Sequence, residues 1–399
     1  MTHAIRVHKH GGPEVLKWDR IEVGDPGPGE VKIRQTAIGL NFIDVYHRTG
    51  HYPQPSLPFI PGSEAAGVIT AVGPGVRDLK VGRHVAYAGI IGAYTEERLI
   101  PADRVVKIRQ TAIGLNFIDV YHRTGHYPQP SLPFIPGSEG AGVVTAVGPG
   151  VRDLKVGRHV AYAGVTGAYT EERLIPADRV VNIPKGTSDE VAASIMLKGM
   201  TAQYLLRRTY KVSRDTTILF HAAAGGVGLI ACQWAASWGA TVIGTVGSAG
   251  KALIARAHGC DYVINTREED FVAKVKDYTK GEGVDVVYDS IGKDTFPGSL
   301  DCLKPLGMWV SFGQSSGPVP DFKITLLSQK GSLFATRPSL PHYTATRKDL
   351  VATANDLFEV VADGKVKVAV NQTYALADVA KAHRDLESRM TTGSTVLLP

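Results

Sequence analysis

The chain has 399 residues, of which 44% are hydrophobic and 21% charged, as in a globular protein of two or three domains and unlike a disordered or collagen-like chain. Its formal net charge of +6 comes from 44 basic and 38 acidic residues scattered along the sequence, so a basic tail that binds nucleic acid is not expected. Three cysteines without CxxC spacing argue against a disulfide framework and a cysteine-rich zinc site. Neither a signal peptide nor a membrane-spanning run is evident, and we expect a cytoplasmic protein.

A nearly identical repeat occupies residues 32–106 and 107–181, which we call copy 1 and copy 2. The two copies have the same length and differ at four positions, namely Ala65/Gly140, Ile69/Val144, Ile90/Val165 and Ile91/Thr166. Solenoid repeats diverge and recur several times, so a tandem duplication explains this pattern better. Removing either copy leaves sensible sequence at both junctions, which predicts a parent chain of two domains with a single copy.

Residues 1–187 read as short strands separated by turns rich in glycine and proline. Apolar and polar side chains alternate as in a strand over 31–40, 66–76 and 82–89, and residues 1–31 contain two further strands around a Gly-Gly-Pro-Glu turn. We expect an irregular antiparallel barrel in this region.

From residue 188 the pattern changes to alternating helices and strands, beginning with a helix over 188–208. The expected strands are 216–222, 241–247, 262–265, 284–292, 308–314 and 331–339, and the expected helices between them are 226–239, 251–259, 268–280 and 295–307. This order predicts an α/β fold with a doubly wound parallel sheet of the Rossmann type.

The C-terminal tail is expected to return to the first domain. Its predicted elements are helices over 347–364 and 377–388 and strands over 367–376 and 394–399. We therefore assign residues 1–187 and 340–399 to a catalytic domain and residues 188–339 to a nucleotide-binding domain.

Only one copy of the repeat can pair with both the N-terminal strands and the tail, so the other copy is expected to be a surplus module. We favour copy 2 as the integrated copy, because it continues directly into the second domain. Copy 1, or a composite of the two copies, remains open.

A glycine-rich loop at residues 220–228, FHAAAGGVG, follows a predicted strand and opens a predicted helix. Ala223, Gly225 and Gly228 occupy the three positions of a G-x-G-x-x-G pattern, with alanine at the first. Glycines there allow a tight turn and a close approach of the backbone to a pyrophosphate at the helix N-terminus. The loop predicts a dinucleotide site, and a plain turn between strand and helix is the alternative.

The charges after this loop favour NADPH over NADH. No acidic residue lies between His221 and Asp261, whereas an NAD site places one there to bind the ribose 2′-OH. The second strand instead ends at Gly247 and Ser248, with Lys251 one turn into the next helix, and Arg267 follows the third strand. A hydroxyl and cations suit a 2′-phosphate, although Lys251 could also be an ordinary solvated lysine.

The runs IMLKGMTAQYLLR, HAAAGGVGLIACQWA, VVYDSIG and VSFG, together with AIGLNFIDVYHRTGHYP in the repeat, resemble zinc-free quinone oxidoreductases related to zeta-crystallin. This family belongs to the medium-chain dehydrogenase/reductase superfamily, and the resemblance covers the whole chain except the extra copy of the repeat. It implies a Rossmann domain and a catalytic domain with a GroES-like irregular β-barrel, here containing the duplicated segment. It also implies NADPH as the cofactor and a quinone or another electrophilic small molecule as the acceptor.

Zinc alcohol dehydrogenases of the same superfamily carry a ligand cysteine where this chain has Asn41 and Asn116, and a histidine where it has Ser63 and Ser138. Asparagine and serine are poor zinc ligands, so we predict no metal. Without a Lewis acid, hydride is expected to go to an acceptor that is already electrophilic.

The resemblance also implies the residues of the site. The acceptor pocket would be lined by Asn116, Asp119, Tyr121 and Tyr127, or by their copy 1 twins Asn41, Asp44, Tyr46 and Tyr52. The cofactor would contact Lys198, Thr201, Ala223, Gly225, Gly226, Val227, Gly228, Gly247, Ser248, Lys251, Thr266, Arg267, Ser290, Phe312 and Gly313. Thr266 departs from the family, which usually has a tyrosine there beside the 2′-phosphate, and this change could weaken the affinity for the cofactor.

Two other functions are considered. The first is an NADPH-dependent reductase of enones or alkenals. The second is an RNA-binding or structural crystallin-like role, and the lack of a basic stripe with interspersed aromatic residues argues against it.

The family also implies a homodimer that pairs the edge strand near 331–339, because an unpaired apolar edge would invite aggregation.

Overall fold

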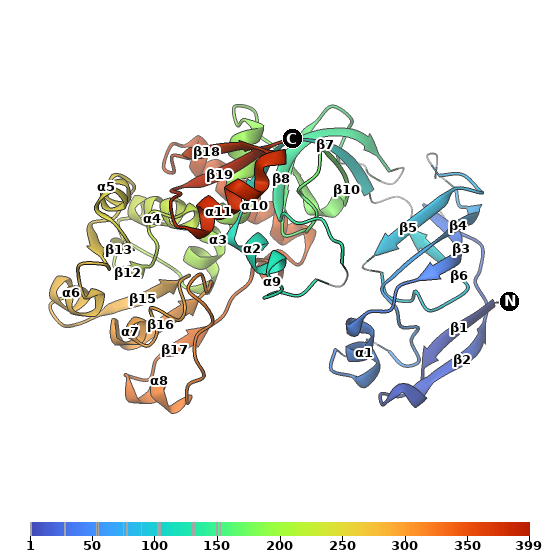
Figure 1. Cartoon of the computed structure of the whole chain (residues 1–399), viewed down its shortest axis with the longest axis horizontal. Coiled ribbons are helices and arrows are strands. Elements are labelled where there is room, and N and C mark those ends of the chain that lie inside the picture. Colours follow the sequence, from blue (N-terminus) through green and yellow to red (C-terminus); the bar gives the residue numbers. More distant parts are fainter. Residues whose placement is uncertain are drawn as a thin grey trace.

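The computed structural model of the chain describes residues 2–27, 29–52, 54, 56–74, 76, 79–88, 90–101, 105–129, 132–148, 151 and 153–399. Figure 1 shows these residues as two bodies, an N-terminal lobe of residues 2–101 and a main body of residues 105–399. The junction between the two copies, at residues 102–104, lies outside the described residues. Within the described part of the chain, no helix is long and apolar enough to cross a membrane.

The main body contains the six-stranded parallel sheet predicted for the cofactor domain. Its order is β14 (Tyr262–Asn265), β13 (Thr241–Val246), β12 (Thr217–Phe220), β15 (Val284–Asp289), β16 (Leu303–Ser311) and β17 (Phe334–Thr336). The helices of this domain are α4 (Gly226–Ser237), α5 (Ala249–Ala257), α6 (Phe271–Tyr278), α7 (Gly298–Asp301) and α8 (Thr325–Gln329). The strand order runs outward from β12 in both directions along the sheet, so the doubly wound Rossmann fold is confirmed.

One element of this domain differs from the prediction. The sequence over 295–307 was expected to be a helix, but α7 ends at Asp301 and β16 begins at Leu303. Leu303 pairs with Val284 of β15 and is buried in the domain core. Pairing with a neighbouring strand therefore overrides the local helical pattern here.

Copy 2 forms the second sheet of the main body together with the C-terminal tail. The order is β11 (Val180–Asn182), β9 (His159–Ala163), β8 (Glu139–Val147), β7 (Val105–Leu115), β19 (Ser394–Leu398) and β18 (Val370–Ala375), and β10 (Glu172–Pro176) also pairs with β7. Thr395, Val396 and Leu397 of the tail pair with the end of β7. The tail therefore closes the open edge of copy 2.

A nearly fully buried helix joins the two domains of the main body. Helix α3 (Asp189–Tyr204) begins at Ser188, whose hydroxyl accepts a hydrogen bond from the Val191 N–H at 3.2 Å, and it continues into a π-helical turn over Leu205–Thr209. It packs against β7, β8 and β9 on one side and against α4 on the other. The remaining helices are α2 (Phe117–Arg123), α9 (Leu340–Tyr343), α10 (Arg347–Ala362) and α11 (Val379–Glu387), with 3-10 turns at Ala177–Arg179 and Leu376–Asp378.

Copy 1 folds in the same way, but in the N-terminal lobe. Its sheet has the order β5 (His84–Ala88), β4 (Glu64–Val72), β3 (Glu30–Ile38) and β6 (Glu97–Pro101), with α1 (Phe42–Thr49) after β3. The strand registers repeat those of copy 2, since Ile33 pairs with Ile69 as Ile108 pairs with Val144. A hairpin of β1 (Thr2–Val7) and β2 (Leu16–Ile21), joined by a 3-10 turn at Pro13–Val15, contacts copy 1 through bridges to Phe59 and Thr95.

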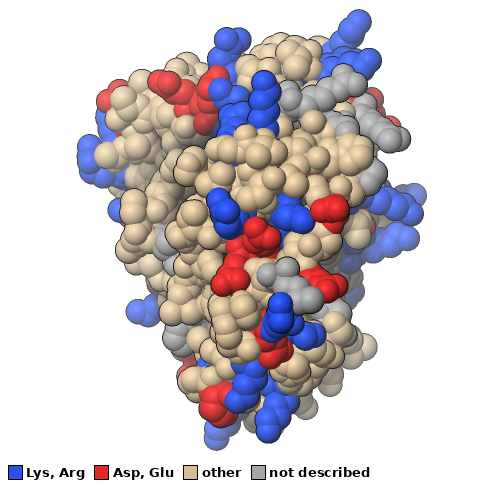
Figure 2. All heavy atoms as spheres, turned by 90° about the vertical axis from the view of Figure 1, so that its right-hand side faces the viewer, with Lys and Arg blue, Asp and Glu red and all other residues tan. Residues whose placement is uncertain are grey.

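The structure thus divides the two flanking segments between the copies, which differs from the expected arrangement of one copy holding both. The hairpin packs on copy 1 and the tail packs on copy 2. Each segment contacts the copy that is nearer along the chain, for which loop closure costs less entropy. Figure 2 shows the face on the side of the N-terminal lobe, where basic and acidic side chains are interspersed around uncharged areas.

Candidate active site

The glycine-rich loop lies between β12 and α4, at the carboxyl end of the sheet. Helix α4 begins at Gly226, directly after the N-cap residue Gly225. A Cβ on Gly228 would lie 2.5 Å from the Ala222 carbonyl oxygen, and a Cβ on Gly226 would lie 2.7 Å from Cδ of Lys198. The glycines are therefore required sterically, and the N-terminus of a helix of this length suits an anionic group.

Three cationic side chains gather where β13 and β14 end. Ser248 caps α5, and its hydroxyl accepts a hydrogen bond from the Lys251 N–H at 3.4 Å. The Lys251 ammonium donates to the Arg389 carbonyl oxygen at 2.7 Å, and a Cβ on Gly247 would lie 3.9 Å from Nε of Arg267. Burial, with repulsion from Arg267 and Arg389, lowers the pKa of Lys251. An added phosphate would relieve this repulsion, so the cluster suits a 2′-phosphate.

The remaining cofactor-contact candidates lie near this sheet edge or along α3. Thr266 follows β14, and its hydroxyl donates to the Val246 carbonyl at 3.2 Å. A Cβ on Gly313, after β16, would lie 2.8 Å from the carbonyl oxygen of Ser290, after β15. The others are Phe312, whose ring lies 5.7 Å from that of Phe220, the half-buried Val227 in α4, Ala223 in the loop and Thr201 in α3.

A buried ion pair links α3 to copy 2. The Lys198 ammonium binds Oε1 of Glu139, which has no exposed surface. The other carboxylate oxygen of Glu139 accepts the Leu197 N–H at 2.6 Å, and Asn116 donates its amide to Oε1 at 2.8 Å. Asn116 and Lys198 are thus placed together, and the pair holds the glycine-loop side of α3 against β8.

Asp119, which the family resemblance implied for the acceptor pocket, is held inside copy 2. It is fully buried and accepts hydrogen bonds from the Ser138 hydroxyl at 2.7 Å, the Tyr169 hydroxyl at 3.0 Å and the Asn116 N–H at 3.0 Å. The last of these belongs to the capping box that starts α2. Burial raises the pKa of Asp119 to about 6. Its observed contacts orient α2.

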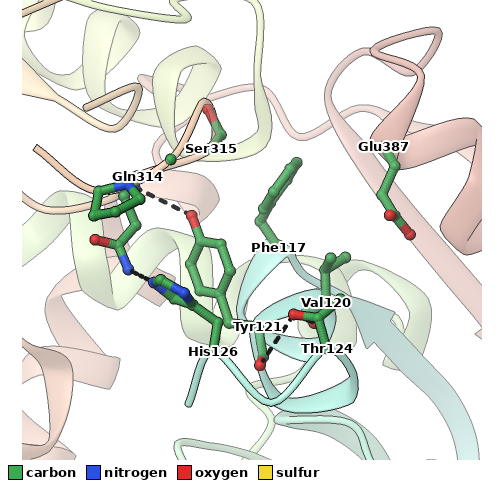
Figure 3. A pocket seen from close by; sticks show the side chains of 10 residues that line it. Phe117, Val120, Tyr121, Thr124, His126, Gln314, Ser315 and Glu387 are labelled. Carbon is green, nitrogen blue, oxygen red and sulfur yellow. Dashed lines mark hydrogen bonds between the residues drawn. The ribbon is translucent and has the colours of Figure 1, made fainter. Parts of the chain in front are cut away.

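A pocket of about 310 Å³ lies between α2 and the loop after β16 (Figure 3). It is lined by Phe117, Val120, Tyr121, Thr124, His126, Gln314, Ser315, Gly317, Pro318 and Glu387. The Tyr121 hydroxyl accepts the Gln314 N–H at 3.1 Å, so this tyrosine spans the two domains. Burial raises the pKa of Tyr121 to about 12, which keeps its hydroxyl protonated and able to donate at neutral pH.

Tyr127 packs against Tyr121 of this pocket. Its ring packs edge-on against Tyr121 with centroids 5.2 Å apart, and its hydroxyl accepts from Nη2 of Arg337 at 3.1 Å. Arg337 also donates to the Gly313 carbonyl at 2.8 Å. Both tyrosines of copy 2 therefore contact the cofactor domain.

The copy 1 twins have the same local contacts but a different surrounding. Asn41 donates to Glu64 at 3.1 Å, and Asp44 accepts from Ser63 at 3.1 Å. Tyr46 and Tyr52 pack edge-on at 5.2 Å, as their twins do. All of these contacts lie inside the N-terminal lobe, and the side chain of Tyr52 is 49% exposed.

Sequence reasoning missed several residues of these sites. Arg389 follows α11, far along the chain from the Rossmann strands, and no local motif marks it. Gln314 and Glu387 reach the pocket beside Tyr121 from the cofactor domain and the tail. Phe117 and Val120 could have been found, because they share one face of the helix that the capping box predicts.

Comparisons with known proteins agree with this architecture. The Zinc-binding dehydrogenase family matches residues 226–350, and the Alcohol dehydrogenase GroES-like domain family matches twice, at residues 27–110 and 102–185. A quinone oxidoreductase of Salmonella typhimurium is 54% identical over 302 residues, which cover 75% of this chain and 92% of the relative. A 2-haloacrylate reductase of Burkholderia is 39% identical and covers 100% of this chain and 99% of the relative.

A solved structure of Escherichia coli quinone oxidoreductase complexed with NADPH is 42% identical, covers 100% of both chains and has a TM-score of 0.63. These matches define a member of the medium-chain dehydrogenase/reductase superfamily, with a Rossmann domain and GroES-like domains. Within it, the chain belongs to the quinone oxidoreductase family.

Proposed function

We propose that this chain is an NADPH-dependent oxidoreductase that transfers hydride to a quinone without using zinc. The observation that carries the proposal is the placement of the Tyr121 pocket on the same main body as the glycine loop and the Lys251–Arg267–Arg389 cluster. The related structure that contains NADPH supports the choice of cofactor.

The residues that would hold NADPH fit it. The N-terminus of α4 suits the pyrophosphate, and Ser248, Lys251, Arg267 and Arg389 suit the 2′-phosphate. When bound, NADPH supplies the hydride. The chain positions the acceptor: Tyr121 stacks against a flat ring or donates its hydroxyl proton in a hydrogen bond to an acceptor oxygen, and Phe117 and Val120 exclude water from that side.

Steady-state rates with 1,2- and 1,4-quinones, compared with those for alkenones, test this function. We expect the quinones to be reduced with the higher kcat/KM. The alternative, an enone or alkenal reductase, is favoured by the similarity to the 2-haloacrylate reductase over the full length of both chains. Faster turnover of alkenones than of every quinone would select it.

Lys251→Ala is expected to raise the KM for NADPH about tenfold, the equivalent of about 1.4 kcal/mol, and to leave the KM for NADH unchanged. The reason is that Lys251 belongs to the cationic cluster beside Ser248. NADH lacks the 2′-phosphate that would bind this cluster. Lys365→Ala, at an exposed lysine paired with Asp363, is the matched control. Equal changes for both cofactors would refute the assignment of the 2′-phosphate site.

The zinc-ligand positions do not fit a metal. Asn116 presents an amide N–H to Glu139, Ser138 donates its hydroxyl to Asp119, and the Lys198 ammonium binds Glu139. In the part of the chain that the structure describes, no three His, Cys, Asp or Glu side chains are grouped as metal ligands would be. We predict that exhaustive chelation leaves the rate unchanged, and elemental analysis showing one zinc per chain would contradict this.

We also propose a homodimer through the outer edge of β17. This strand is the last of the parallel sheet, and Phe334 in it is 56% exposed. An apolar edge of this kind is normally covered. Light scattering at micromolar concentration is expected to give the mass of two chains, and the mass of one chain would count against the dimer.

A further inference from the structure

The N-terminal hairpin (β1 and β2, residues 2–21) docks on copy 1 through contacts that copy 2 can also offer. Main-chain hydrogen bonds join Ile5 N–H to the Tyr94 carbonyl at 2.8 Å and Glu96 N–H to the His3 carbonyl at 2.9 Å. Val7 and Phe59 exchange two more, at 2.9 and 3.2 Å. Side chains add to this interface, since Glu96 accepts hydrogen bonds from the Thr2 hydroxyl and the His3 N–H, and copy 2 has a glutamate, Glu171, at the equivalent position.

The twins of these docking residues are present and uncovered in copy 2. Within the described part of the chain, the N–H groups of Phe134 and Glu171 and the carbonyl of Tyr169 take part in no backbone hydrogen bond. Ile135 is 53% exposed and Leu174 is 68% exposed, whereas Ile60 and Leu99 of copy 1 are half-buried. Copy 2 thus carries a formed docking surface without its hairpin.

The residues of copy 1 that contact the turn of the hairpin also have uncovered twins in copy 2. On copy 1, the Arg48 guanidinium donates to the Gly11 carbonyl at 2.5 Å, and a Cβ on Gly50 would lie 2.9 Å from the His10 ring. On copy 2, a Cβ on Gly125 would meet nothing within 4 Å, and Arg123 instead forms an exposed ion pair with Glu387. Exposed pairs contribute little, so Arg123 can be drawn to the hairpin at small cost.

None of the four positions that differ between the copies belongs to the docking contacts named above. The contact free energy of the hairpin should therefore be nearly equal on the two copies. The choice between them then depends on the linker, residues 22–29.

The linker is long compared with the separation between the copies at the positions where their first strands begin. Glu30, where it ends, pairs with Pro101, so their Cα atoms lie about 5 Å apart. The chain from Pro101 to Val105, the residue of β7 that is equivalent to Glu30, spans at most about 14 Å, and the eight linker residues reach about 28 Å when extended. The extended linker is therefore longer than the greatest separation between these two equivalent strand positions.

We propose that the hairpin of each chain exchanges between two docking sites, the occupied one on copy 1 and the vacant one on copy 2 of the same molecule. Docked on copy 2 in the same way, residues 10–12 would lie beside the end of α2, next to Thr124 and His126, which line the pocket beside Tyr121. This exchange is independent of the proposed catalytic function, because it follows from the repeat and the hairpin contacts alone.

Matched cysteine pairs test the exchange in the full-length chain. Ala4 and Thr95 are bridge partners, so Ala4→Cys with Thr95→Cys places two thiols within disulfide range, and Ala4→Cys with Thr170→Cys does so only when the hairpin is on copy 2. The three native cysteines are buried and common to both variants. The products are read by non-reducing electrophoresis and peptide mass spectrometry after mild oxidation at low micromolar protein.

Both variants are expected to form the intrachain disulfide, the Thr170 variant more slowly, because the contact free energies are nearly equal but docking on copy 2 closes a longer loop. A disulfide in the Thr95 variant alone would overturn the proposal. So would a Thr170 variant that links only between two chains, since the hairpin would then exchange between molecules. If a buried cysteine at position 4 prevents folding, Val7→Cys paired with Phe59→Cys or with Phe134→Cys gives the same comparison.

Discussion

Lys198→Met is expected to destabilise the main body by about 3–5 kcal/mol, because it leaves the Glu139 carboxylate buried without its countercharge. Glu139 has no exposed surface, and its remaining partners, the Leu197 N–H and the Asn116 amide, are neutral. For a domain of this size the loss corresponds to a drop in Tm on the order of 10 °C, measured by calorimetry.

Two further variants separate this charge effect from a simple loss of packing. Adding Glu139→Gln to Lys198→Met removes the unpaired charge and is expected to restore more than half of the lost stability. Glu64→Gln in copy 1 is the matched control, because Glu64 binds Asn41 without a lysine partner, and it should change the stability by less than about 1 kcal/mol. A Tm of Lys198→Met within about 2 °C of the unchanged protein would contradict the assigned role of the pair.

The cofactor domain was the part most fully predicted from the sequence. Its strands are short, apolar and separated by helices, and this local pattern agrees with the tertiary fold; β14 lies at the predicted residues 262–265. The structure also places the glycine loop and the Ser248–Lys251 segment each between a strand and a helix, as the sequence pattern predicted. The end of the predicted helix 295–307 was wrong, since strand pairing extends β16 to Leu303.

The repeated region was predicted less well. Helices α1 and α2 were not expected. The three-residue spacing of Asn116 and Asp119, which form a capping box, is a sequence pattern that predicts the start of α2. The division of the hairpin and the tail between the copies could not be predicted, because two nearly identical sequences offer identical local surfaces. Chain connectivity and tertiary contacts decide between them. Arg389 and Gln314 reach their sites from remote segments for which the sequence has no local pattern.

The two copies provide an internal comparison for the acceptor site. Tyr121 and Tyr46 lie in the same sequence, on equivalent helices and against equivalent tyrosines. Tyr121 lines the pocket and accepts a hydrogen bond from Gln314 of the cofactor domain, whereas Tyr46 lies in the N-terminal lobe. Of these two tyrosines, Tyr121 is the one that contacts the cofactor domain, and this contact supports the proposed acceptor site.

Steady-state quinone reduction by Tyr121→Ala and Tyr46→Ala tests the central claim, that copy 2 and the cofactor domain together form the active site. Tyr121→Ala is expected to lower kcat/KM for the quinone about a hundredfold, because an acceptor that is misplaced by about 1 Å loses that much rate. Tyr46→Ala should leave kcat/KM within about twofold of the unchanged enzyme, which is under about 0.5 kcal/mol. The dissociation constant for NADPH, measured on both variants, should stay unchanged. Equal losses in the two variants, or a larger loss in Tyr46→Ala, would contradict the claim.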